Sequence, residues 1–152
     1  MLHQTKFKFR RELALRKEGA TKFIILHHSG VSSSHTAEDV HRWHQKRGWA
    51  GIGYHYFITK DGEVFEGRPH NTVGAHTRGH NKESIGVCFE GNFDKEELTK
   101  QQEHAAVELL TQLRNAYPQA QLRRHNNFTL NKTCPGKRFP FAWLQQHVEK
   151  IS

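Results

Sequence analysis

The spacing of hydrophobic and polar residues changes several times along the chain, and each change indicates a different element. Residues 22–27 (Lys-Phe-Ile-Ile-Leu-His) form a short apolar run typical of a buried central strand. Residues 54–59 alternate, Asp61-Gly62 is a two-residue turn signal, and residues 63–67 continue as a return strand, which together predict a β-hairpin. Two further runs predict strands: residues 84–90 and residues 121–125.

Three other segments carry apolar residues at the spacing of an amphipathic helix. The first spans residues 36–48, beginning with a threonine N-cap and ending at a glycine; the others span residues 99–116 and 140–150. Residues 68–82 have no periodicity and predict a long loop, which in a compact domain is often functional. Strands interleaved with helices predict a single α/β domain, with a central mixed β-sheet flanked by helices.

The composition is that of a globular protein. At 152 residues the chain has the length of one domain, which buries roughly two thirds of the surface of its unfolded form. No apolar run approaches the ~20 residues of a membrane-spanning helix. The first 22 residues lack the apolar core and small-residue cleavage site of a secretory signal. We therefore expect a protein without a membrane anchor or signal peptide, synthesised and folded in a cytoplasm.

The formal net charge of +8 is unevenly distributed. Residues 1–22 contain seven Lys or Arg and two Glu, a balance of +5, which leaves +3 for the other 130 residues. We interpret residues 1–21 as a basic N-terminal arm or helix and residues 22–152 as the main domain. The basic segment is either a solvated helix face or a contact with an anionic envelope or nucleic acid. No RNA-binding signature or four-ligand zinc finger supports a nucleic-acid binder.

Candidate metal ligands gather in one polar segment near the C-terminus. His125, Lys132 and Cys134 lie within ten residues, and histidine nitrogen and cysteine thiolate are ligands that Zn²⁺ accepts. A catalytic zinc needs a third protein ligand, and His27 is a candidate because it ends the first predicted strand. Cys88 lies in an apolar run and is expected to be a buried free thiol rather than a disulfide partner. Most of the thirteen histidines are surface or core residues, so the hypothesis depends on this arrangement.

Several motifs occur in an order that carries a family resemblance. They are Phe-Ile-Ile-Leu-His27-His-Ser, Gly48-Trp-Ala-Gly-Ile-Gly-Tyr54-His-Tyr-Phe-Ile, Asp61-Gly-Glu-Val-Phe-Glu-Gly-Arg68, Val73-Gly-Ala-His76, Asn81-Lys-Glu-Ser-Ile-Gly-Val-Cys88, and His125 followed by Lys132-Thr-Cys134-Pro. The series runs from about Lys22 to Trp143 and resembles the zinc-dependent N-acetylmuramoyl-L-alanine amidases, in particular the short amidase-type phage lysozymes. The peptidoglycan recognition proteins share their fold, so the resemblance implies that architecture here.

The resemblance also assigns roles to individual residues. It implies that one zinc ion is bound by His27, His125 and Cys134, with Tyr54 and Lys132 as the catalytic groups beside the metal. Zinc lowers the pKa of a bound water to about 7, which supplies a nucleophile for amide hydrolysis. We expect Lys132 to stabilise the oxyanion, and Tyr54 to orient the water or relay a proton to the leaving amine.

Four positions need separate interpretation. In the loop over residues 68–82, His76 and Asn81 are predicted substrate contacts by resemblance. His28 is the rival of His27, but neighbours on a strand face opposite sides, and the motif position favours His27. Relatives with a glutamate at the position of Cys88 use that carboxylate as general base. A buried thiol does not replace it, so proton transfer is expected to fall on the two catalytic groups.

The implied activity is hydrolysis of the amide bond between N-acetylmuramic acid and L-alanine in peptidoglycan. The expected setting is a bacteriolytic phage endolysin, a monomer that reaches the cell wall after the inner membrane opens and contacts the anionic envelope through its basic N-terminus. A bacterial wall-recycling amidase and a non-catalytic peptidoglycan-binding module are the alternatives. The complete ligand set favours an enzyme over the binding module. Control of a polymerase, known among similar phage lysozymes, is a further role that the sequence does not test.

Overall fold

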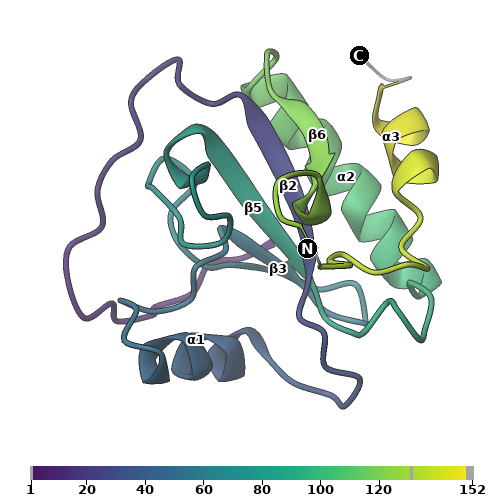
Figure 1. Ribbon diagram of the computed structural model, residues 1–152, viewed down its shortest axis with the longest axis horizontal. Helices are drawn as coiled ribbons and strands as arrows, with labels where there is room; N and C mark the ends of the chain where they lie inside the picture. The colour runs from purple at the N-terminus through teal and green to yellow at the C-terminus, as the bar shows by residue number, and fades with distance from the viewer. Residues whose placement is uncertain (1, 131, 150–152) are drawn as a thin grey trace.

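A mixed β-sheet forms the centre of the molecule in the computed structural model, which describes residues 2–130 and 132–149 (Figure 1). Its six strands are ordered β1-β4-β3-β5-β2-β6. The strands are β1 (Leu2–His3), β2 (Phe23–His28), β3 (Tyr56–Ile58), β4 (Val64–Glu66), β5 (Ser84–Phe89) and β6 (Gln121–Arg124). Only the β3–β4 hairpin pairs antiparallel, and the other neighbours pair in parallel. The predicted mixed α/β architecture is confirmed.

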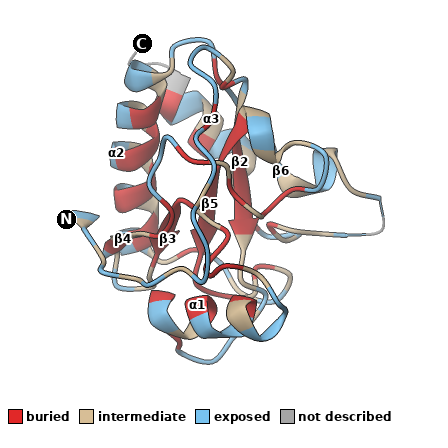
Figure 2. Cartoon of the chain, turned by 90° about the vertical axis from the view of Figure 1, so that its left-hand side faces the viewer, coloured by how far each residue is buried: buried red, intermediate tan, exposed pale blue. Residues whose placement is uncertain are grey.

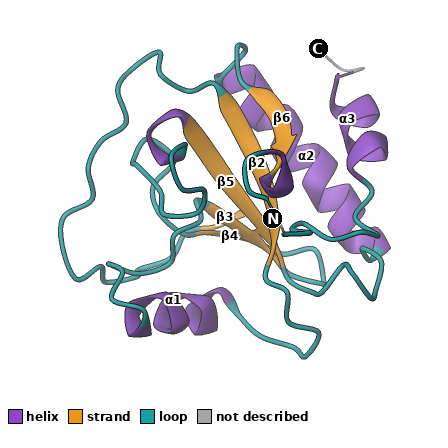
Figure 3. Ribbon diagram, viewed as in Figure 1, coloured by secondary structure: helices purple, strands orange, loops and turns teal. Residues whose placement is uncertain are grey.

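Helices cover both faces of this sheet (Figure 3). Helices α2 (Lys100–Ala116) and α3 (Phe141–Glu149) lie on one side, and α1 (Ala37–Lys46) lies on the other. Two short 3₁₀ helices, η1 (Asn81–Glu83) and η2 (His125–Asn127), follow the long loop and β6 respectively. A capping box begins each of the first two α-helices, from Thr36 in α1 and Thr99 in α2, as the residue types at these positions favour.

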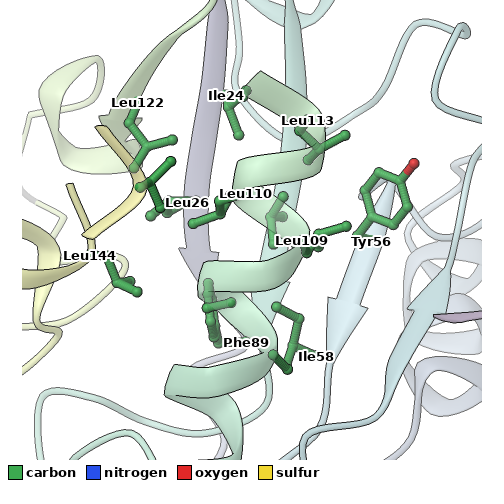
Figure 4. Packing of buried hydrophobic residues seen from close by; sticks show 14 of the residues in the cluster. Ile24, Leu26, Tyr56, Ile58, Phe89, Leu109, Leu110, Leu113, Leu122 and Leu144 are labelled. Carbon is green, nitrogen blue, oxygen red and sulfur yellow. The ribbon is translucent and has the colours of Figure 1, made fainter. Parts of the chain in front are cut away.

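The larger hydrophobic core fills the space between the sheet and α2. Alternate strand residues such as Ile24 and Leu26 point toward the helix. They pack against Leu109, Leu110 and Leu113 of α2 in one buried cluster (Figure 4). Red, buried positions accordingly run along the inner side of α2 in Figure 2. The intervening strand residues face α1, where Phe57 and Cys88 join a smaller buried cluster. This alternation decides which side of the sheet each functional residue of a strand can reach.

The basic N-terminal segment is extended, and no helix forms over residues 2–21. β1 pairs with β4, and Phe7 and Phe9 pack on the His41 ring at centroid distances of 4.5 and 5.3 Å. Lys6 and Lys8 alternate with these aromatic rings and point to solvent. The helix alternative is therefore wrong, because the side chains here repeat with the two-residue period of extended chain rather than with a helical period.

Buried Arg16 anchors the end of this arm. Its guanidinium donates to the Thr21 hydroxyl at 2.6 Å and to the carbonyls of Thr72 and His70 at 3.0 and 2.5 Å. The arm is thus part of the folded domain rather than a separate appendage. None of the helices in the described part of the chain has the length and apolar character that a membrane crossing requires.

Candidate active site

Three potential metal ligands meet at one end of the sheet. β2 pairs in parallel with β6 so that Leu26 lies opposite Arg124, and the next residue of each chain segment is a histidine. His27, His125 and Cys134 each offer one ligand atom, and these atoms lie within 4.8 Å of one another. The structure therefore brings together the three residues that the resemblance implied as ligands. His28 is not in this group, since it faces the other side of the sheet and its Nδ1 accepts from the Phe93 N–H at 3.1 Å.

The turn that carries Cys134 is fixed by hydrogen bonds on both sides. The Thr133 hydroxyl and the Lys137 N–H donate to the Asp94 carboxylate at 2.7 and 2.9 Å. The Cys134 carbonyl accepts from Asn126 N–H at 2.9 Å, which joins the turn to η2. The His28 N–H donates to the sulfur at 3.3 Å. Together these bonds hold the thiol beside the end of β2.

The protonation states of the three side chains suit a metal cation. Burial, followed by neighbouring histidines, holds the pKa of His27 well below its usual value. Burial and the charge of Lys132 lower the pKa of His125 to about 4, and burial raises the pKa of the Cys134 thiol to about 12. Both imidazoles are therefore neutral at pH 7, and the thiol needs a nearby cation to ionise.

One nitrogen in this group has no partner in the described part of the protein. His125 Nδ1 is buried and makes no hydrogen bond to any described residue. His27 Nδ1 lies 3.8 Å from the Cys134 sulfur. Buried polar atoms are normally satisfied, so an orphaned nitrogen beside a second imidazole and a thiol indicates a missing ligand. Two nitrogens and one sulfur match the donors that zinc accepts.

A cleft of about 800 Å³ opens beside these residues. Tyr54, Lys132, His76 and Asn81 all line it, together with His125 and Cys134. The exposed cations at this cleft are Arg47, Arg78 and Lys132, and no Asp or Glu of the described chain lines it. The cleft is therefore positively charged and favours an anionic ligand.

Tyr54 lies between His27 and α1. Its ring centroid is 5.1 Å from that of His27 and 5.4 Å from that of His44. Burial raises the Tyr54 pKa well above its usual value, with a further contribution from the Cys88 thiol, which interacts with the hydroxyl. The hydroxyl consequently keeps its proton at neutral pH and can donate it to a group in the cleft.

His76 and Asn81 line the cleft, but the Asn81 side-chain oxygen and both ring nitrogens of His76 have partners inside the protein. The Asn81 side-chain oxygen accepts from the N–H groups of His76 and Thr77, both at 2.9 Å. His76 Nδ1 lies 2.9 Å from His27 Nε2, and its Nε2 lies 3.2 Å from the Ser84 hydroxyl. These bonds connect the long loop to the metal-site residues.

The cleft also contains residues that were not predicted from the sequence as site residues. His44 lies on the buried side of α1, and the Gly53 N–H donates to its Nδ1 at 2.9 Å. Trp49 lines the cleft and carries the Arg47 guanidinium 5.5 Å above its ring. The helical spacing of residues 36–48 indicates that His44 is buried, but only the path of the following loop places it beside Tyr54. No periodicity marks Arg78 in the long loop.

Comparison with known proteins gives concordant matches. Residues 17–137 match the family described as N-acetylmuramoyl-L-alanine amidase. The endolysin of Escherichia phage T7 is 34% identical over 140 residues, covering 88% of this chain and 92% of the phage protein. The endolysin of Enterobacteria phage K11 is 33% identical over 125 residues, covering 79% of this chain and 82% of that protein.

Solved structures agree with these matches. N-acetylmuramoyl-L-alanine amidase LysC from Clostridium intestinale URNW superposes with a TM-score of 0.92 at 33% identity, covering 98% of this chain and 97% of that one. Peptidoglycan recognition protein-LE, solved with tracheal cytotoxin, a monomeric diaminopimelic acid-type peptidoglycan, superposes with a TM-score of 0.81 at 28% identity. That match covers 92% of this chain and 87% of the recognition protein.

The buried histidines predict acid sensitivity of the metal-free protein. Burial lowers the pKa of His44 and of His55 to about 3. Between pH 6.5 and 3 the unfolded chain binds protons that these native rings do not, so the free energy of unfolding falls as pH falls. Each of these two rings contributes about one proton, or about 1.4 kcal/mol per pH unit, and His27, His76 and His125 add to the slope. Urea unfolding in EDTA from pH 7 to 5 measures the slope.

Two variants serve as a comparison for this slope. His55→Gln removes one buried imidazole and should reduce proton uptake on unfolding by about one. His147→Gln removes an exposed imidazole from α3 and is the matched control for the loss of one histidine. A free energy of unfolding that stays constant between pH 7 and 5 would contradict the neutral state of these rings.

Proposed function

The chain belongs to the N-acetylmuramoyl-L-alanine amidase family, and on that premise we propose that its cleft cleaves the amide bond between N-acetylmuramic acid and L-alanine with a zinc-activated water. The chain is a peptidoglycan hydrolase similar to phage endolysins that cover most of its length. The observation that carries the proposal is the convergence of His27, His125 and Cys134. The last two of these residues line the cleft.

Zinc suits this site better than a hard cation. Hard cations such as Mg²⁺ and Ca²⁺ prefer oxygen ligands, whereas two neutral imidazoles and a cysteine are typical zinc ligands. Three protein ligands are the usual number for a catalytic zinc. When bound, zinc would lower the pKa of a water to about 7 and polarise the substrate carbonyl.

Tyr54 and Lys132 would act on the charges and protons that hydrolysis creates. Attack on the amide carbonyl produces an oxyanion, and the ammonium of Lys132 at the cleft stabilises negative charge there. The Tyr54 hydroxyl keeps its proton and can donate it to the leaving amine of L-alanine. By the resemblance, Cys88 stands where some relatives carry a glutamate as general base. No described carboxylate lines the cleft of this chain. Proton transfer therefore falls on Tyr54 and Lys132.

The charge of the cleft supports a peptidoglycan substrate. Stem peptides carry free carboxylates, and Arg47, Arg78 and Lys132 provide three cations around the cleft. A non-catalytic binding module would not need a protonated tyrosine hydroxyl next to two histidines and a cysteine that can bind a metal. The runner-up setting is a bacterial amidase that recycles wall fragments, which performs the same chemistry on a soluble substrate.

The basic arm would provide a second contact, with the anionic cell envelope. Lys6 and Lys8 point to solvent from an extended segment that Phe7 and Phe9 fix to the domain. Surface cations of this kind raise the local concentration of an enzyme at an anionic surface, and salt screens the attraction. In the endolysin setting, this contact would operate once the inner membrane has opened and the enzyme has reached the wall.

Digestion of purified peptidoglycan tests the reaction and its metal requirement together. We expect free amino groups on L-alanine, no new reducing sugar ends, and loss of both hydrolysis and bound zinc after treatment with a chelator. Restoring Zn²⁺ should restore cleavage. New reducing ends would show a glycosidase instead, and full cleavage by chelated, metal-free protein would rule out the zinc mechanism.

Substitutions at the two catalytic groups test their assignment. Tyr54→Phe should lower hydrolysis by about 10²–10⁴-fold through loss of proton transfer, and Lys132→Ala by about 10²–10³-fold through loss of oxyanion stabilisation. Zinc content should stay at one ion per chain in both variants. The matched controls are Tyr56→Phe, on the α2 side of the sheet, and Lys137→Ala, outside the cleft. Wild-type activity in either test variant would overturn that residue's role.

Paired lysine substitutions test the arm without unfolding it. Deletion of the arm would also remove buried Arg16 and the aromatic contacts, so neutralising Lys6 and Lys8 is the cleaner change. Lys6→Gln with Lys8→Gln should reduce lysis of whole cells at low salt but leave hydrolysis of soluble muropeptides unchanged. The control is Lys95→Gln with Lys100→Gln, which removes the same charge elsewhere on the surface. If both double variants lose lysis at low salt to the same extent, the net charge of the protein, and not the arm, is responsible for the attraction.

A further inference from the structure

A buried chain of hydrogen bonds runs from His27 to the backbone of the long loop. His27 Nε2 lies 2.9 Å from His76 Nδ1, and His76 Nε2 lies 3.2 Å from the Ser84 hydroxyl. The Ser84 hydroxyl in turn donates to the His80 carbonyl at 2.7 Å. The exposed fractions of His27, His76 and Ser84 are 1%, 9% and 0%. Solvent therefore does not compete for these hydrogen bonds. Each of these side chains needs the next group in the series as its hydrogen-bond partner.

The carbonyl at the far end fixes the direction of every proton in this chain. A carbonyl oxygen can only accept, so Ser84 uses its single proton on His80. Ser84 Oγ must then accept from His76 Nε2–H. A neutral imidazole that donates at Nε2 has a bare Nδ1, so His76 accepts from His27 Nε2–H. His27 is left with a bare Nδ1, the atom that lies 3.8 Å from the Cys134 sulfur.

The His76 ring occupies a slot that the surrounding backbone defines. A Cβ placed on Gly86 would lie 2.6 Å from the ring, and one placed on Gly74 would lie 2.7 Å from it. The Asn81 side chain holds the His76 backbone N–H, and the Thr77 hydroxyl lies 2.9 Å from Nδ1. Two glycines and one asparagine thus place the imidazole in a single orientation, in which both nitrogens are already engaged.

We infer that His76 is a positioning residue for the metal site: it selects the Nε2–H tautomer of His27 and turns the bare Nδ1 toward the metal. This inference rests on the proposed zinc site and gives His76 a role other than the substrate contact that the resemblance implied. Imidazole ligands of metals commonly donate their second N–H to such a partner, which fixes the ring and raises its basicity. The Ser84 hydroxyl and the His80 carbonyl extend that support to the backbone.

The tautomers can be measured in the metal-free protein. Long-range ¹H–¹⁵N spectra of ¹⁵N-histidine-labelled wild-type protein distinguish Nδ1–H from Nε2–H imidazoles. Both His27 and His76 should carry the proton on Nε2 before any zinc is added. Ser84→Ala removes the acceptor for His76 and should produce a mixture of tautomers at both rings. A His27 ring protonated on Nδ1 in the wild-type protein would overturn the inference.

Zinc affinity gives the second readout, by competition with a chromogenic chelator. His76→Phe keeps a ring in the slot but removes the acceptor, and should weaken zinc binding by about 10–100-fold. His76→Asn places an amide oxygen where Nδ1 was and should recover most of that loss. His41→Phe, a buried histidine of α1 bonded only to backbone groups, should lower thermal stability but leave zinc affinity unchanged.

The outcomes separate this inference from the proposed function. Failure of the wild-type protein to bind zinc would count against the metal site itself. Wild-type affinity in His76→Phe, with zinc bound normally by the wild-type protein, would count against the role of His76 alone. If His76→Phe does not fold, Ser84→Ala decides: an affinity equal to wild type together with unchanged tautomers would contradict the inference.

Discussion

The register between β2 and β6 is the constraint on which the candidate site depends. Parallel pairing sets Leu26 opposite Arg124, so the histidine that follows each of them emerges at the same edge and on the same face of the sheet. The ring centroids of His27 and His125 are 4.5 Å apart as a result. A slip of one residue in either strand would exchange the two faces and direct His28, rather than His27, toward the side of His125. The pairing of the two backbones therefore decides that His27, and not His28, lies beside His125.

Loops position the remaining residues of the candidate site. Asp94 holds the turn that carries Cys134, and the bonds of Asn81 place His76 against His27. These contacts hold the three candidate ligands in place, whereas Arg47, Arg78 and Lys132 at the cleft stay exposed. Burial keeps the imidazoles neutral and the thiol protonated without a cation, whereas solvent keeps Lys132 accessible to a substrate. One cleft thus combines a buried set of ligands with a polar, positively charged surface.

Most of the fold follows from local patterns in the sequence, because periodicity reports which side of an element is buried. The strand over residues 22–27, the hairpin and the helices were predictable in this way, and strand alternation with motif position separated His27 from His28. Ligand chemistry, rather than periodicity, singled out His125 and Cys134, and the resemblance added Tyr54. The charge of the arm does not predict its extended form, whereas the alternation of Lys6, Phe7, Lys8 and Phe9 in the sequence does indicate extended chain. The partners of His76 were not predictable, because they depend on how a long loop folds back on the sheet.

The most direct test of the zinc site is a crystal structure of the purified protein, with data collected on both sides of the zinc absorption edge. One anomalous peak should appear at about 2.0–2.3 Å from His27 Nδ1, from a nitrogen of His125 and from the Cys134 sulfur. The His27–His76 hydrogen bond should remain intact beneath it. A zinc ion bound at other residues, or coordinated by His28 or by His76, would contradict the account of how this chain builds its active site.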